Sequence, residues 1–367
     1  MFSKPLSLIL VYLITIFNLS IVMSPFFGAI VPFTNLYDID FVNRSANIDK
    51  SLLDKMLFAI MFNGFLISFF MLIYLFFDLL LGFSVRYSLK KCKRYEKVKG
   101  FDFLTDIFEQ VKVKFNQPNV KLYIKGSNEV NAFAVSSLGY KAIVITNGMV
   151  NHYLKSCNDP KKFLYAMRSI IGHEMSHLIN KDFLPGFLIM ANQRATNFVL
   201  RIVSLFFHYF VRLVSLNPYG GHFLALLMQN IYYLINFILS FFNRFIVYNL
   251  YRFLNLWISR SIEYRCDAQS AVAFGGDKMA MALSMLGKNG YFTLFSTHPS
   301  TKNRINKVVN IKSKDEIILP KIFDALSNYF AIMLLIVICL CFAEECNVDY
   351  LIRNYGVKVV RYIRYFI

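Results

Sequence analysis

The apolar residues of this chain are gathered into long uncharged blocks instead of being spread at the spacing of a soluble core. Residues 6–32 and 56–77 contain no Asp, Glu, Lys or Arg, and a further uncharged run covers residues 325–343. About 20 apolar residues are enough to cross a bilayer as a helix. The pattern therefore predicts a membrane protein. Lys4 precedes the first block and no small-residue cleavage site follows it, which favours an uncleaved anchor.

The charges between the blocks predict a topology. Residues 86–99 contain seven Lys or Arg against one Glu, whereas the linker between the first two spans carries several Asp. Lys and Arg are enriched in cytoplasmic loops. We therefore expect an N-terminal hairpin, residues 1–85, that places both of its ends and the domain after it on the cytoplasmic side.

Two later apolar segments leave the topology open. In residues 193–250, Arg194, Arg201, His208 and Arg212 are spaced to share one helix face, and a turn sequence follows them. Such a helical hairpin is membrane-associated, either lying at the interface or spanning with its basic face turned inward. In residues 321–367, an apolar run followed by a basic tail gives conflicting topology signals.

Residues 100–181 have the pattern of a soluble α/β segment. We expect an amphipathic helix over residues 101–115 and short strands over 120–125, 131–136 and 142–146. Asp159 followed by Pro160 is a helix start, with an N-cap and a proline at the first helical position.

Composition excludes some functions. Hydrophobic residues make up 56% of the 367 residues, charged residues 17%, and the net charge is +18. This positive charge lies beside apolar blocks, without the fold signatures of a nucleic-acid binder, so we expect a lipid bilayer and no nucleic acid as a partner. The six cysteines have no C-x-x-C spacing, which argues against a disulfide framework or a cysteine zinc site.

The predicted helix that starts at Asp159 runs into the sequence His173-Glu174-Met-Ser-His177. This H-E-x-x-H pattern is that of a metalloprotease zinc site. Residues four apart lie above one another on a helix, so His173 and His177 can both reach one ion. Glu174, beside them, can hold a water molecule without binding the metal.

A catalytic zinc site needs a third protein ligand. Glu263 and Asp267 lie four apart in a downstream helical pattern, so Glu263 can be that ligand and Asp267 can accept a hydrogen bond from a ligating imidazole. By spacing alone, an equally good interpretation is that both carboxylates pair with Arg260 and Arg265 on a solvated face.

The sequence resembles the HtpX-type membrane-bound zinc metallopeptidases (gluzincins) from about Gln117 to Val309. The N-terminal pair of spans and the apolar hairpin between metal helix and third ligand are also traits of that family. The resemblance rests on blocks in the same order: residues 118–123, 131–134, 144–148, 173–177, 263–268, 296–299 and 304–305.

The resemblance implies roles for individual residues. His173, His177 and Glu263 would bind one zinc ion per chain, Glu174 would be the catalytic base, and Asp267 would support a ligand. His298 would donate to the developing oxyanion or, alternatively, cap local backbone in a loop. The substrate strand would include Asn131, Ala132 and Phe133, with the alternative that Asn131 only closes a turn, and Arg304 would be a structural ion-pair partner.

The fold class expected is α+β: a mostly helical zincin-like metalloprotease domain with a small β-sheet, combined with transmembrane helices. Its two parts would be residues 86–192, with the metal helix, and 251–320, with the third ligand. The C-terminal segment and Cys266, beside the third ligand, depart from the family. The cysteine could oxidise or compete for metal, although a buried apolar role suits it better.

The resemblance implies a quality-control endopeptidase, multi-pass in the cell inner (plasma) membrane, with its active site facing the cytoplasm and misfolded or damaged membrane proteins as substrates. Two alternatives remain open. One is a CAAX prenyl endopeptidase-like protease, although Ser176 and Leu178 occupy the positions that distinguish that class. The other is a non-catalytic, membrane-anchored zinc-binding assembly protein. Oligomeric state is not predicted.

Overall fold

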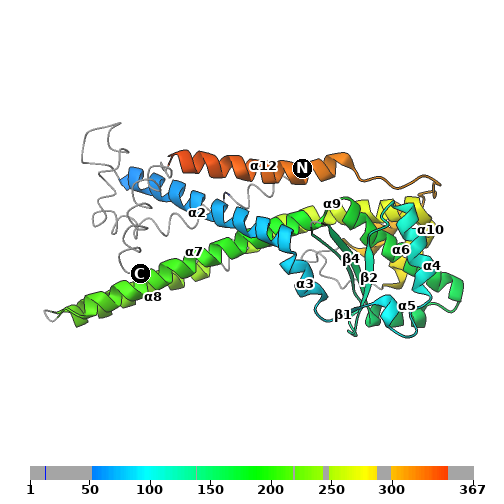
Figure 1. The fold of residues 1–367 in the computed structure, drawn as a ribbon, viewed down its shortest axis with the longest axis horizontal. Helices are drawn as coiled ribbons and strands as arrows, with labels where there is room; N and C mark the ends of the chain where they lie inside the picture. Colours follow the sequence, from blue (N-terminus) through cyan, green and yellow to red (C-terminus); the bar gives the residue numbers. More distant parts are fainter. Residues whose placement is uncertain are drawn as a thin grey trace, which may run out of the picture. The chain divides into compact units, whose positions relative to one another are not determined.

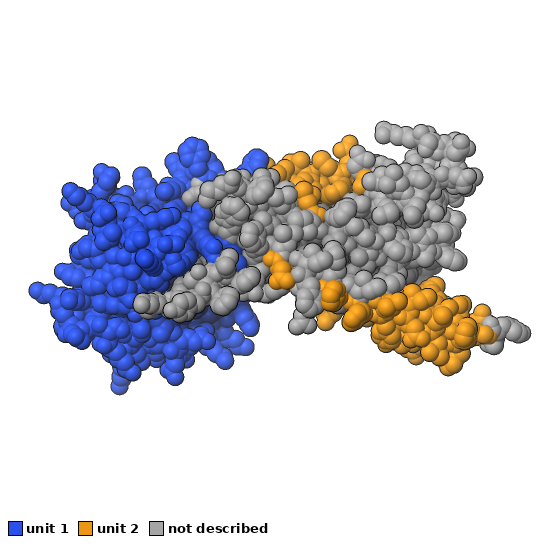
Figure 2. Space-filling model, turned by 180° about the vertical axis from the view of Figure 1, so that it is seen from behind, with its two compact units in different colours: residues 1–5, 75–187, 252–330 blue, residues 6–74, 188–251, 331–367 orange. Residues whose placement is uncertain are grey.

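A computed structural model describes residue 13 and residues 52–137, 139–217, 220–242, 248–286 and 299–345. The first predicted span (apart from Leu13), His298 and the basic tail lie outside these residues. The chain divides into two compact units (Figure 2). The first unit comprises residues 1–5, 75–187 and 252–330, and the second comprises residues 6–74, 188–251 and 331–367.

The first unit contains a four-stranded mixed sheet of order β1-β2-β4-β3. β2 and β4 are parallel, and the other two pairs are antiparallel. The three predicted strands are confirmed to within a few residues, but β1, three residues inside the basic segment, was not predicted because it has no apolar alternation. The strands are β1 (Cys92–Arg94), β2 (Lys121–Lys125), β3 (Ala132–Ser137) and β4 (Tyr140–Thr146).

Helix α6 (Pro160–Ile179) lies at the centre of this unit. The Asp159 side chain caps it by accepting from the backbone N–H of Lys161 at 2.9 Å, as the Asp-Pro pair predicted. Its apolar face, including Ile171 and Met175, is fully buried in the main core. Figure 1 shows α6 with its neighbours beside the sheet: α4 (Leu104–Lys114), α5 (Asn147–Ser156) and α10 (Gly276–Met285). Helix α11 (Thr301–Val308) packs on α10.

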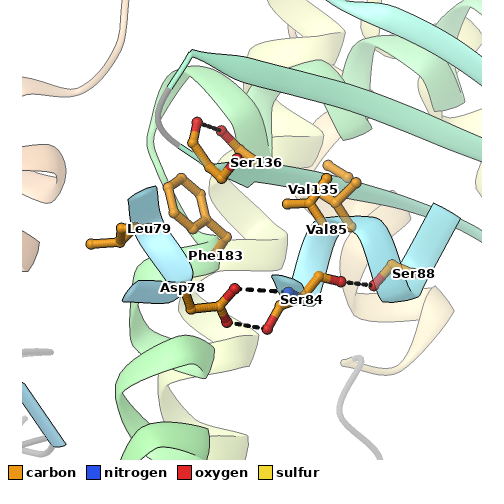
Figure 3. Close-up of a pocket in the computed structure, with 10 residues that line it drawn as sticks. Asp78, Leu79, Ser84, Val85, Ser88, Val135, Ser136 and Phe183 are labelled. Atoms are coloured by element: carbon orange, nitrogen blue, oxygen red, sulfur yellow. Dashed lines mark hydrogen bonds between the residues drawn. The ribbon is translucent and has the colours of Figure 1, made fainter. Parts of the chain in front are cut away.

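The joint between α2 (Leu52–Leu81) and α3 (Phe83–Leu89) is held by Asp78 (Figure 3). One oxygen of its buried carboxylate accepts from the Ser84 backbone N–H at 2.7 Å, and the other accepts from the Ser84 hydroxyl. Gly82 breaks the helix with φ +64°, a left-handed conformation that favours glycine. The chain therefore changes direction at a fixed point next to the first unit's sheet, where α3 contacts both β1 and β3.

The two helices predicted for the apolar hairpin are present as α7 (Phe183–Ser215) and α8 (Gly221–Phe242). They pack together in the second unit, where the Phe207 ring stacks on Tyr232 at 4.3 Å between centroids. The Tyr232 hydroxyl also donates to Ser204 Oγ at 2.6 Å.

Within the described part of the chain, one stretch, Gly64–Leu81 of α2, is long and apolar enough to cross a membrane. It overlaps the predicted span 56–77. The predicted span 325–343 falls in α12 (Ile322–Glu345), whose apolar stretch, Ile332–Glu344, is shorter.

Candidate metal centre

Helix α6 places His173 and His177 side by side, as their spacing predicted. The ring centroids are 4.9 Å apart and the two Nε2 atoms 3.2 Å apart. His173 and the adjacent Glu174 are buried, and His177 is partly exposed. The helix thus brings two imidazole nitrogens to one point, with a carboxylate on the neighbouring residue.

Glu263 reaches the same point from α9 (Tyr248–Phe274). Its Oε2 atom lies 3.6 Å from Nε2 of His173, and its Oε1 atom lies 3.7 Å from Nε2 of His177. Atoms about 2.0–2.2 Å from a tetrahedral zinc ion lie about 3.3–3.6 Å from one another. The three side chains therefore have a spacing that fits one zinc ion between them.

The other ring nitrogens face carboxylates. Nδ1 of His173 donates to Asp267 Oδ1 at 2.8 Å, and Nδ1 of His177 donates to Asp182 Oδ2 at 3.0 Å. With each Nδ1 protonated, the Nε2 atoms of the neutral rings present lone pairs to one another and to the Glu263 carboxylate. Such facing lone pairs repel unless a cation lies between them, so the set of donors fits a metal ion.

Asp182 was not predicted, and a helix terminus positions it. The Lys181 N–H bonds to Leu178 O at 3.3 Å and the Asp182 N–H bonds to His177 O at 3.1 Å, the two hydrogen bonds of a Schellman motif. Lys181 has the left-handed conformation, with φ 55°. Glycine usually takes this position, so the one sequence signal that would have revealed the turn is missing.

Asp267 and Arg304 form a buried ion pair behind His173. The guanidinium donates from Nε to Oδ2 and from one terminal nitrogen to Oδ1 of Asp267, both at 2.7 Å. A terminal nitrogen of Arg304 also lies 3.3 Å from Glu263 Oε2. Burial alone would raise the pKa of Asp267, but the hydrogen bonds from Arg304 and His173 hold it below its ordinary value. Asp267 thus stays ionised as an acceptor for the ligand imidazole.

The acidic pair on α9 is buried, which contradicts the interpretation that it lies on a solvated face. Glu263 and Asp267 face the histidines and Arg304 in the interior, so neither lies on a solvated face. Arg265, considered as their partner, instead donates to Asp182.

Close contact between α6 and α9 fixes Glu263 opposite the histidines. A Cβ atom on Gly172 would lie 2.7 Å from the Phe274 ring and 3.0 Å from Ser270 Oγ, so a larger residue here would displace these side chains. Ser270 Oγ donates to Ser169 O at 2.7 Å. Ser176 and Asn180 both donate to the Gln269 side-chain oxygen, the latter at 2.7 Å. Buried polar bonds of this kind set the register between the helices.

Cys266 is fully buried, as expected, but its surroundings are polar. Its Sγ atom lies 3.4 Å from His177 Nδ1 and 3.6 Å from Asp182 Oδ2. Burial of the His177 ring acts to lower its pKa, yet Cys266, Asp182 and Glu174 raise it well above its ordinary value. These groups therefore favour a cation at His177, and a metal ion bound at Nε2 would take the place of a proton there.

The residues expected on the substrate strand lie at the start of β3, one of the two edge strands of the sheet. Asn131 is exposed just before β3, and its backbone N–H donates to Thr146 Oγ1 at 3.1 Å. Ala132 and Phe133 are the first residues of β3, which contacts α6. Farther along, residues 134–137 line a small pocket with Asp78, Ser84 and Phe183 (Figure 3). His298 lies outside the described residues.

Comparison with known proteins identifies the family of the chain. Residues 101–312 match the model of peptidase family M48. The chain belongs to that family.

Within the family, its relatives are HtpX proteases, as the sequence resemblance predicted. The chain is 27% identical over 215 residues to a protease HtpX homolog of Neisseria meningitidis, covering 53% of this chain and 66%, just under two thirds, of the relative. It is 26% identical over 230 residues to protease HtpX of Buchnera aphidicola, covering 57% of this chain and 73% of the relative.

Proposed function

We propose that the chain is a membrane-bound zinc endopeptidase. His173, His177 and Glu263 would hold the metal and Glu174 would be the general base. The observation that carries this proposal is the convergence of two Nε2 atoms and one carboxylate, at 3.2–3.7 Å from one another, beside a second buried carboxylate. A structural zinc site normally has four protein ligands, whereas three ligands with an adjacent carboxylate suit catalysis.

Bound zinc would supply Lewis-acid chemistry, polarising the scissile carbonyl and acidifying a water molecule. Side chains of the protein would transfer the protons and orient the metal ligands. Glu174 accepts the proton of the attacking water and transfers it to the leaving amine. Asp267 and Asp182 keep Nδ1 of each histidine protonated, so that both Nε2 atoms stay available as ligands.

The substrate we propose is an extended segment of an unfolded or damaged membrane protein. Because β3, which begins with Ala132 and Phe133, is an edge strand that contacts α6, a peptide could add to it as a further strand. Recognition through backbone hydrogen bonds would tolerate many side chains. The pocket beside residues 134–137 would accept one side chain of such a peptide.

We place the protein in the inner (plasma) membrane as a multi-pass protein, with the metal site on the cytoplasmic side. Support comes from the apolar stretch Gly64–Leu81 and the basic residues 86–99 that follow it. Tyr87, 82% exposed, offers a test. In Tyr87→Cys, a membrane-impermeant maleimide should add label above the wild-type level only after the cells are opened. Extra labelling of intact cells would contradict this orientation.

The central experiment compares wild type with Glu174→Gln, purified in detergent, for zinc content and cleavage of casein. We expect about one zinc per chain in both and cleavage by wild type alone, abolished by chelator and restored by zinc. Glu316→Gln, which neutralises an exposed carboxylate of the same unit, should cleave normally.

Other outcomes separate the alternatives. Equal zinc without cleavage by either protein would favour the non-catalytic zinc-binding assembly protein. Cleavage of prenylated peptides but not of casein would favour the CAAX-type protease. Absence of zinc from both, with the fold intact, would contradict the metal site itself.

A further inference from the structure

A cavity of about 540 Å³ opens where α2 ends, between α3 and the sheet. This volume lies within the range of about 300–1,000 Å³ that is typical of small-molecule sites. Its lining combines three kinds of residue: the leucines at the end of α2, the cations Arg86 of α3 and Lys90 at its C-cap, and the sheet residues Tyr123 and Tyr140. No carboxylate is among the described residues that line it.

The polar groups suit a phosphate. Arg86 of α3 and its C-cap residue Lys90, which keeps helical backbone angles, are four apart, so both lie on the helix face that lines the cavity. The hydroxyls of Tyr123 and Tyr140 bond to one another, which uses one of their two hydrogens and leaves the other to donate elsewhere. Lys121 adds a third positive charge, its Nζ atom 4.8 Å from the centre of the Tyr140 ring.

The apolar groups suit acyl chains. Leu80 and Leu81, the last residues of the apolar stretch of α2, line the cavity and are 57% and 40% exposed. Phe83 and Tyr87 of α3 are exposed by 53% and 82%, and aromatic side chains of this kind are enriched at membrane interfaces. A molecule with an anionic head and apolar tails would contact both parts of the lining.

Residues outside the cavity fix the direction of helix α3, which forms one of its walls. The Asp78 carboxylate binds the Ser84 N–H and hydroxyl, and the Ser88 hydroxyl donates to Ser84 O at 2.9 Å (Figure 3). Gly82 takes a left-handed conformation, and a Cβ atom there would lie 3.1 Å from Ser137 Oγ. The direction of α3, and with it the position of its two cations, is therefore set before any ligand binds.

We propose that this cavity binds the headgroup of an anionic glycerophospholipid, with Arg86 and Lys90 on the phosphate and the acyl chains along Leu80 and Leu81. The site rests on the membrane location in the proposed function but not on the protease chemistry. Lipid bound there would fix the end of the spanning helix against the sheet that carries β3.

The test is native mass spectrometry of the full chain in detergent, titrated with phosphatidylglycerol or phosphatidylcholine of the same acyl chains. Wild type should bind one phosphatidylglycerol at least tenfold more tightly than phosphatidylcholine. Arg86→Gln/Lys90→Gln should lose about 25-fold in phosphatidylglycerol affinity. Arg86→Lys/Lys90→Arg, which keeps both charges, should retain most of it. Lys161→Gln/Lys162→Gln, which removes two exposed charges elsewhere in the same unit, should bind as wild type does.

Equal binding of the two lipids by wild type would overturn the proposal, as would unchanged binding by Arg86→Gln/Lys90→Gln. Competition by glycerol 3-phosphate or inorganic phosphate at the concentration of the lipid would assign the cavity to a soluble phosphate instead. Casein cleavage is measured separately, so loss of cleavage with intact lipid preference would contradict the protease and not the lipid site.

Discussion

Arg304 holds both oxygens of Asp267 through two 2.7 Å hydrogen bonds, and one of those oxygens also accepts from Nδ1 of His173. The guanidinium thus reaches the proposed ligand His173 through Asp267, and it also lies 3.3 Å from the proposed ligand Glu263. Both side chains of the pair are buried, so removing Arg304 leaves the Asp267 carboxylate buried without its cationic partner.

Arg304→Gln should weaken zinc binding by about tenfold and lower thermal stability. Groups that orient ligand histidines typically change metal affinity by about 10- to 100-fold, and Arg304 acts through such a group. Competition with a chromophoric chelator gives the affinity. Lys302→Gln, with the same loss of charge on the exposed part of α11, is the control. Equal zinc affinity in all three proteins would show that Asp267 is positioned without Arg304.

Asp182→Ala should reduce zinc affinity by about 10- to 100-fold, because Nδ1 of His177 loses its acceptor. The Cys266 sulfur lies 3.4 Å from the same nitrogen and can partly replace Asp182 as its acceptor. We therefore expect a loss of zinc affinity nearer to about tenfold than to about 100-fold. Asp182→Asn retains an acceptor oxygen and should bind zinc more tightly than Asp182→Ala.

Asp159→Ala makes the matched comparison for Asp182, since it removes the N-cap of the same helix. It should lower stability by about 1 kcal/mol and leave zinc affinity unchanged. If both alanine variants lose zinc affinity equally, the effect comes from the stability of α6 and the orienting role of Asp182 is wrong.

The parts of the site that follow from helical periodicity were predictable from sequence. The spacing of His173 and His177, and of Glu263 and Asp267, determines which residues share a face of α6 or α9. That the two faces meet depends on a contact between residues about a hundred apart in the chain, such as Gly172 with Phe274. No local pattern contains that information, and the family resemblance supplied it.

Other features were missed for physical reasons. Asp182 depends on a left-handed Lys181, where sequence rules look for glycine. β1 is three residues long in a basic segment, and its pairing with β2 comes from the tertiary structure. The one-residue offset at the end of α4 is ordinary fraying, but the start at Leu104 instead of Phe101 reflects a preceding turn.

The Tyr140 hydroxyl should ionise at a higher pH than an ordinary tyrosine. Burial, and then its hydrogen bond with Tyr123, raise its pKa from 10.0 to about 12. Because this pKa is above the unfolded value, the neutral hydroxyl's contribution to stability is complete below pH 10 and is lost as pH rises through about 12. The tyrosinate absorbance of Tyr140→Phe, subtracted from that of wild type at each pH, should show the Tyr140 hydroxyl ionising near pH 12. When Tyr123→Phe removes the hydrogen bond, Tyr140 should ionise at lower pH. An unchanged Tyr140 pKa in Tyr123→Phe would contradict a contribution from that hydrogen bond.

Gly172→Ala should destabilise the metal centre although alanine favours helix. The helix propensity gained is at most about 1 kcal/mol, whereas overpacking a buried crossing costs about 1–3 kcal/mol. The new methyl group would meet the Phe274 ring at 2.7 Å and Ser270 at 3.0 Å, so α9 must move and carry Glu263 away from the histidines.

Zinc affinity and thermal stability should therefore fall together in Gly172→Ala. In Gly126→Ala the added Cβ meets nothing within 4 Å, so that variant should match wild type in both measurements. A Gly172→Ala protein with lowered stability but unchanged zinc affinity would mean that the position of Glu263 is set by the Ser176, Asn180 and Gln269 hydrogen bonds and not by the close approach of the two helices.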